Sequence, residues 1–161
     1  MGYVHNTHMA VKTPLSDIVP TVGTWAFAIA SNITTLNKTA GDNTSVLSIP
    51  ILTPQNSQVN AGGKLVSVDI YYINATANLD AMSAKVWKAT LPAQAGTLST
   101  AEVPSTSTFV LTQTQNKVTI EIDDPIYIAE DEDVYVELTI DAAAASVVKL
   151  QAVVANYTLR I

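Results

Sequence analysis

Apolar and polar residues alternate with a period of two along several segments of the chain. The pattern is clearest at 64–74 (Val66, Val68, Ile70, Tyr72), 117–123 (Val118, Ile120, Ile122) and 133–141 (Val134, Val136, Leu138, Ile140). A period of two places each apolar set on one face of a β-strand, so these segments predict half-buried strands. Weaker patterns predict further strands at 24–30, 44–52, 82–90, 108–112 and 146–159.

Turn-forming residues separate these segments, for example at 41–43, 60–63 and 123–125. Strands joined by such loops predict an all-β fold, a two-sheet antiparallel β-sandwich of jelly-roll type spanning residues 24–161. The stretch 98–107 is rich in Ser and Thr and contains Pro104, which predicts a long surface loop. The last strand carries apolar residues on both faces near its end, which indicates either a bulge or burial on both sides.

Composition narrows the class of protein. The chain has 161 residues, 48% of them hydrophobic and only 14% charged, with no Cys. This length suffices for one domain that folds without disulfides, and the missing Cys excludes a zinc finger, a redox dithiol and a Cys nucleophile. The net charge of −6 argues against direct nucleic-acid binding, which needs clustered Lys and Arg. No segment approaches the ~18 consecutive apolar residues of a membrane span, so no membrane partner is expected.

Residues 1–23 are expected to form an extended N-terminal arm ahead of the sandwich, because their apolar residues follow no regular period. The arm could add a strand to its own sheet or dock on a neighbouring subunit, since strand addition serves both arrangements. Our hypothesis is the second, an arm that ties the protein into an assembly. The candidate interface residues are Tyr3, Val4, Met9, Val11, Leu15 and Ile18.

Candidate chemistry is sparse. His5 and His8 have a spacing that can bind metal, but no further ligand accompanies them, so no metal site and no cofactor are predicted. Nine of the 14 acidic residues lie at 121–141, and clustered carboxylates suit calcium, although the EF-hand spacing is absent and the question stays open. Glu121 and Glu137, expected on adjacent strands, are a conceivable glycosidase pair, but outward carboxylates usually form a solvated face. No catalytic residue is therefore predicted, and the chain is not expected to be an enzyme.

The two Trp residues have different patterns. Trp25 alternates with Phe27 and Ile29 on one strand face, which predicts a place in the core. Trp87 lies on a strand whose faces are ambiguous, and exposed Trp can stack on sugar rings. Trp87 is therefore the candidate contact of the alternative function, a carbohydrate-binding, lectin-like module of a phage tail or cell-surface protein.

The chain lacks Cys, is rich in Thr, Asn and Ala, and contains the segments 23–27 (GTWAF), 40–50 (AGDNTSVLSIP), 67–72 (SVDIYY) and 126–138 (IYIAEDEDVYVEL). In these features it resembles small structural proteins of tailed-phage virions. The resemblance implies a non-enzymatic capsid decoration or accessory subunit on the outer capsid surface. It further implies a homo-oligomer, most often a trimer, that docks on a major capsid protein. The near absence of basic residues from the arm favours a position away from the genome.

Overall fold

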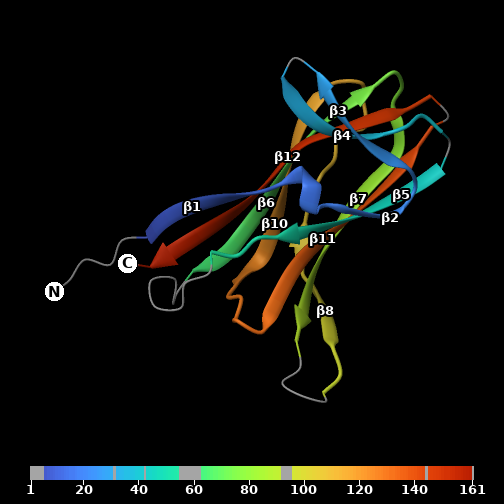
Figure 1. Ribbon diagram of the computed structural model, residues 1–161. Helices are drawn as coiled ribbons and strands as arrows, with labels where there is room; N and C mark the ends of the chain where they lie inside the picture. Colours follow the sequence, from blue (N-terminus) through green and yellow to red (C-terminus); the bar gives the residue numbers. More distant parts are fainter. Residues whose placement is uncertain are drawn as a thin grey trace.

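The computed structural model describes residues 6–30, 32–41, 43–54, 63–91, 96–143 and 145–160, which form two antiparallel β-sheets packed face to face (Figure 1). Sheet A has the order β3 (Trp25–Ala30), β4 (Ile33–Lys38), β12 (Val147–Arg160), β6 (Lys64–Ala75), β10 (Gln115–Ile126) and β9 (Ser105–Thr106), and β1 (Asn6–Thr13) also pairs with β12. Sheet B has the order β2 (Val19–Val22), β5 (Asn43–Ile51), β11 (Glu132–Ala142), β7 (Leu79–Thr90) and β8 (Ser99–Val103). The predicted all-β, two-sheet antiparallel sandwich is confirmed.

The connectivity is that of a jelly roll. Within sheet A the strands β4, β12, β6 and β10 are neighbours, and within sheet B the strands β5, β11, β7 and β8 are neighbours. Consecutive strands therefore lie in opposite sheets more often than they pair, as two interlocked Greek keys require: β11 is in sheet B, whereas β10 and β12 are in sheet A. This arrangement decides which side chains can share a face.

The core lies between the sheets and is made by the strands with the clearest alternation. On sheet B, Val136 of β11 stands between Ile49 of β5 and Val86 of β7, and all three side chains are fully buried. On sheet A, Ile70 of β6 stands between strands β10 and β12, opposite Val118 and Val153. Burying an aliphatic side chain of this size contributes about 1.5–3 kcal/mol, so these central strands supply much of the stability of the fold.

Four of the weaker strand predictions are also confirmed, since 24–30, 44–52, 82–90 and 146–159 correspond to β3, β5, β7 and β12. The last strand has a bulge, one of the two alternatives that its apolar residues indicated. The pairing of β12 with β6 shifts register between Leu150 and Ala152 and again between Asn156 and Tyr157.

Two predictions around residues 98–112 are wrong. The stretch 98–107 is not one loop, because β8 and β9 form on either side of Pro104 and pair with different sheets. The stretch 108–112 is not a strand, because it pairs in register with no strand: its backbone bonds mostly to side chains, and Leu79 N–H at the start of β7 donates to the Leu111 carbonyl. The Tyr72 hydroxyl accepts from Val110 N–H and lies 3.0 Å from its carbonyl oxygen, and Asn74 Nδ2 donates to the carbonyls of Val110 and Thr112.

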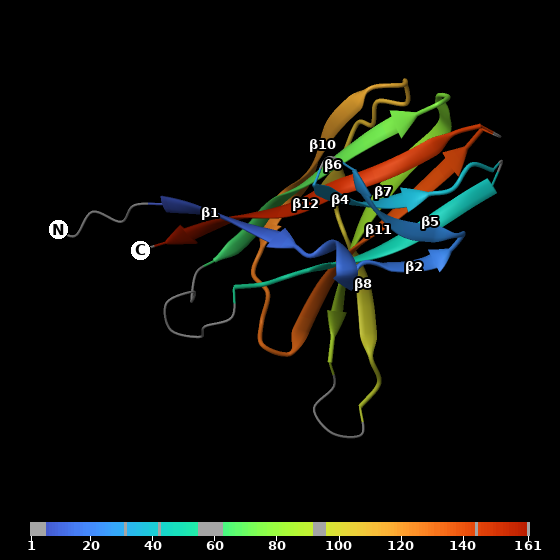
Figure 2. The same cartoon turned by 45° about the horizontal axis from the view of Figure 1, so that its top comes forward.

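Residues 6–22 are part of the sandwich. β1 runs antiparallel to β12 from Asn6 opposite Arg160 to Thr13 opposite Val153, and β2 pairs with β5. The short 3-10 helix η1 (Leu15–Asp17) joins β1 to β2 across the two sheets, as Figure 2 shows. No helix in the described part of the chain is long and apolar enough to cross a membrane.

The outer face of sheet A holds a nearly buried carboxylate, that of Asp69 on β6. It accepts hydrogen bonds from Thr119 Oγ1 at 2.7 Å and Asn156 Nδ2 at 3.1 Å, and Lys117 Nζ lies 2.9 Å away. Burial alone would raise the pKa of the Asp69 carboxyl, but these three partners outweigh it and hold the pKa below its ordinary value. The network joins β10, β6 and β12 across sheet A.

We predict that Tyr72→Phe destabilises the protein by roughly 1–3 kcal/mol, because it leaves Val110 N–H without its acceptor. The free energy of unfolding in urea measures this loss. Tyr127→Phe is the matched control, since Tyr127 is 53% exposed and should leave stability unchanged. An unchanged midpoint for Tyr72→Phe would show that the hydroxyl does not hold the 107–114 segment.

We also predict that the Asp69 carboxylate makes stability depend on pH. Its folded-state pKa is depressed, so the stabilisation is complete above the unfolded pKa of about 3.9 and is lost as the pH falls through the folded value. The free energies of unfolding of the wild type and Asp69→Asn should therefore differ near neutral pH and converge on acidification. Asp123→Asn, which alters an exposed carboxylate, should track the wild type throughout. A constant difference between wild type and Asp69→Asn across the acid range would contradict the assignment.

Candidate functional site

Trp87 lies on the outer face of sheet B, next to a second ring-bearing residue. In the pairing of β7 with β11 it stands opposite Tyr135, and in the pairing of β11 with β5 Tyr135 stands opposite Pro50. Residues directly opposite in an antiparallel pair have Cβ atoms about 4.5–5.5 Å apart. Trp87, Tyr135 and Pro50 thus form one continuous row across three strands, which we call the platform.

The local sequence explains why these side chains point outward. In β7 and β11 the flanking residues Val86, Val134 and Val136 are buried between the sheets, so the residues that alternate with them face solvent. Trp87 and Tyr135 are each only half-buried. The ambiguity in the sequence about Trp87 is therefore resolved in favour of the outer face.

Tyr135 and Pro50 were missed as site residues by the sequence analysis. The alternation at 133–141 already placed Tyr135 on the polar, outward side of its strand. What the sequence lacked was the register between β11 and its neighbours, which comes from strands distant in the chain and brings Tyr135 beside Trp87.

Polar side chains surround the platform. Lys85, two residues before Trp87, has its Nζ 3.3 Å from Glu102 Oε2 on β8 and 5.8 Å from the centre of the Trp87 ring. Glu137 stands opposite both Lys85 and Ser48 in the adjacent row. Hydroxyl, carboxylate and ammonium groups thus lie in the row next to the rings on the same face, where they can donate and accept hydrogen bonds.

The Trp87 ring presents carbon rather than its N–H group to solvent. Its Nε1 atom is buried and has no hydrogen-bond partner among the described residues. The exposed part of the ring is therefore apolar and suited to stacking. Carboxylates of Glu102, Asp133 and Glu137 outnumber the single ammonium of Lys85 around it, so this face favours a neutral ligand over an anion.

The expectation that Glu121 and Glu137 lie on adjacent strands is wrong. Glu121 is on β10, opposite Ser67 in sheet A, whereas Glu137 is on β11 in sheet B. Both face outward, and the two sheets separate them. Consecutive strands of a jelly roll cross between sheets, so neighbours in the sequence need not pair.

The acidic region 121–141 does not gather into a metal site. Among the residues that the structure describes, no group of three or more His, Cys, Asp or Glu side chains could hold a metal ion. Glu132 accepts from Ala129 N–H at 3.0 Å and from Lys88 Nζ at 2.7 Å, and these two bonds, the backbone one first, lower the pKa of its carboxyl. His8 lies on β1 opposite Thr158, and His5 lies outside the described residues.

The predicted interface residues of the arm differ in burial. Leu15 and Ile18 are buried in the core of their own chain, and Met9 and Val11 are partly buried against it. Tyr3 and Val4 lie outside the described residues. Leu15 and Ile18 are thus covered by their own sandwich rather than presented to a partner.

The prediction of a core face on the first Trp strand is wrong for two of its three residues. Trp25 is partly buried against the core, but Phe27 is 55% exposed and Ile29 is 77% exposed. These two side chains are exposed because β3 pairs only with β4 and forms the outer edge of sheet A.

Comparison with known proteins gives similarity in structure only. No protein-family model and no curated protein matches the sequence. A family 29 carbohydrate-binding module from Piromyces equi aligns at 13% identity over 94% of this chain and 90% of its own, with a TM-score of 0.41. The CBM22-1–GH10 modules of Clostridium thermocellum xylanase 10B align at 7% identity over 96% of this chain and 28% of theirs, with a TM-score of 0.46. The enzymatically active domain of tailspike protein 4 from bacteriophage CBA120 aligns at 8% identity over 97% of this chain and 19% of its own, with a TM-score of 0.42.

The chain therefore spans less than a third of the xylanase and tailspike chains, but nearly the whole of the family 29 module. At these identities the similarity describes the fold and not the ligand.

The prediction of a capsid decoration subunit is corrected by these findings. It depended on an arm free to dock on a shell, and residues 6–22 pair instead with β12 and β5 of the same chain. Self-association of the chain stays a prediction.

Proposed function

We propose that the protein is a non-catalytic carbohydrate-binding domain that binds a neutral oligosaccharide across the platform on sheet B. The observation that carries the proposal is the row of Trp87, Tyr135 and Pro50 on the outer face of three paired strands. A sugar ring has an apolar C–H face and a rim of hydroxyl groups. The platform offers the matching arrangement, with rings in the middle and polar groups around them.

The apolar part of the interaction would come from the two aromatic rings. Trp and Tyr bury large areas and lose little side-chain entropy on binding, which is why they dominate contact surfaces. The strands that carry both rings are held in place, because the flanking residues of β7 and β11 are packed in the core. A preformed surface of this kind limits the entropy lost on binding.

The polar part would come from the groups beside the rings. Lys85 and Glu102 are half-exposed and bond to each other, with side-chain exposures of 53% and 50%, so a hydroxyl group can exchange with either partner at small cost. Glu137 and Ser48 add acceptors and a donor in the next row. These groups are on rigid strands, which fixes the positions of the hydroxyl groups that they can bind.

Binding without hydrolysis is the activity that this geometry supports. Cleavage of a glycosidic bond needs two carboxyl groups that flank the bond, about 5–9.5 Å apart, and a site that encloses the sugar. Glu137 lies beside an open platform on the face of a sheet, and Glu121 is on the other sheet.

We predict that Trp87→Ala and Tyr135→Ala each weaken binding of the best neutral ligand by roughly 10- to 100-fold, as loss of one stacked ring removes about 1.4–2.8 kcal/mol. A glycan array identifies the ligand, and isothermal titration calorimetry then compares the variants. Tyr127→Ala, an exposed Tyr on the β10–β11 connection, is the control and should bind as the wild type does.

Circular dichroism of each variant separates loss of binding from loss of folding. The proposal fails if no neutral glycan binds the wild type, or if folded Trp87→Ala and Tyr135→Ala bind the ligand with unchanged affinity.

A further inference from the structure

Sheet A contains a break along one edge of β12. β4 pairs with Val148 to Leu150 of β12, and β1 pairs with the same edge from Val153 onward. Gln151 and Ala152 lie between these two partners and pair with neither. The register of β12 against β6 also shifts at this point, so Gln151 is the extra residue of a bulge. Bulges of this kind redirect side chains and are common beside functional sites.

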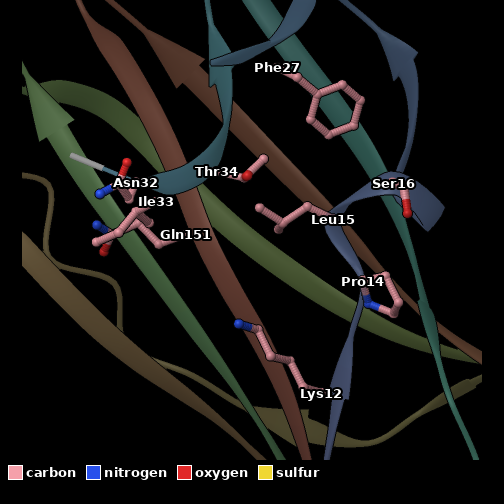
Figure 3. A pocket seen from close by; sticks show the side chains of 9 residues that line it. All are labelled: Lys12, Pro14, Leu15, Ser16, Phe27, Asn32, Ile33, Thr34 and Gln151. Atoms are coloured by element: carbon pink, nitrogen blue, oxygen red, sulfur yellow. The ribbon is translucent and has the colours of Figure 1, made fainter. Parts of the chain in front are cut away.

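A groove of about 590 Å³ opens at this break, a volume within the range of pockets for small ligands. Its polar lining comes from three strands and a turn: Lys12 at the end of β1, Thr34 of β4, Gln151 of β12 and Asn32 in the β3–β4 turn. Figure 3 shows these side chains around a common space, with Leu15 between them and the Phe27 ring at the far side.

Lys12 gives the groove its charge. It is the one charged residue that lines the groove, and it has no ion pair with any carboxylate among the described residues. The nearby Asp17 carboxylate is held by the hydroxyl of Ser16, which also lines the groove. An ammonium group without a carboxylate partner at such a site favours an anionic ligand, because complementary charge selects the partner.

The neutral polar groups of the groove are also uncommitted. The side chains of Asn32, Thr34 and Gln151 make no hydrogen bond to another described residue. Together they supply amide and hydroxyl donors and acceptors, the mixture that a ligand with several hydroxyl groups needs.

Two large apolar side chains also line the groove. Phe27 and Ile33, from the two strands of the β3–β4 hairpin, are 55% and 53% exposed although both are large and apolar. Their position on the edge hairpin leaves them uncovered by the rest of the sandwich. A ligand in the groove would cover this surface, and the Phe27 ring can pack against the C–H face of a sugar.

We propose that the groove is a second binding site, which takes a sugar that carries a carboxylate group, that is, a hexuronate. The carboxylate would bind Lys12 Nζ, the hydroxyl groups would bind Asn32, Thr34 and Gln151, and the ring would pack on Phe27. The groove is at the break between β1 and β4 in sheet A, whereas the platform is on the outer face of sheet B. The two sites share no residue, so neither depends on the other.

The test compares D-glucuronate with D-glucose, which differ at one carbon, by NMR titration of the full chain. We predict that the wild type binds D-glucuronate more tightly and that Lys12→Gln weakens this binding roughly tenfold, the value of one charge-assisted hydrogen bond. Phe27→Ala should also weaken it, and added salt should lower the affinity of the wild type but not of Lys12→Gln.

Lys64→Gln is the matched control, because it removes the same charge at a residue that does not line the groove. Lys64 is the first residue of β6, and its Nζ lies over the Tyr127 ring. Lys64→Gln and Trp87→Ala should bind D-glucuronate as the wild type does. The proposal is overturned if the wild type does not bind D-glucuronate, if D-glucose binds equally well, or if Lys12→Gln and Lys64→Gln behave alike. Trp87→Ala keeps this test separate from that of the platform.

Discussion

The fold depends on packing the inner faces of two sheets whose central strands, β6 and β11, alternate between apolar and polar residues over most of their length. Residues such as Ile70, Leu138 and Ile140 are fully buried between the sheets. A slip of one residue would turn each of these strands inside out, so burial fixes the register as well as the fold. The outward side chains are then determined too, and Trp87 and Tyr135 become neighbours because their own neighbours in the sequence are in the core.

The N-terminal segment shows how the same constraint acts on a stretch without a clear pattern. Alone, residues 6–22 have no periodic apolar face, but β12 offers a free edge and the core accepts Leu15 and Ile18. Backbone pairing and these two buried side chains order the segment. Because β1 and β4 share one edge of β12 and do not meet, the same arrangement creates the groove that Lys12 and Gln151 line.

The strongly alternating parts of the fold were predictable from the sequence, and so was the jelly-roll sandwich. Strands β4, β8 and β9 were not, because they are short and rich in Thr, Ser or Asn and are held by pairing with distant strands. Of the candidate site, Trp87 was identified from residue type alone. Its partner Tyr135 required the register of β7 against β11, 48 positions apart at this pair, and no local pattern carries that information.

The prediction that Glu121 and Glu137 lie on adjacent strands is wrong for the same reason, since closeness in sequence does not decide which strands share a sheet. A chemical-shift map of the isotopically labelled protein, titrated with a neutral oligosaccharide that it binds, tests the platform most directly. Binding at the platform predicts that the largest shifts fall on Trp87, Tyr135 and the polar residues beside them on the outer face of sheet B. Shifts confined to sheet A, with the Trp87 and Tyr135 signals unmoved, would contradict it.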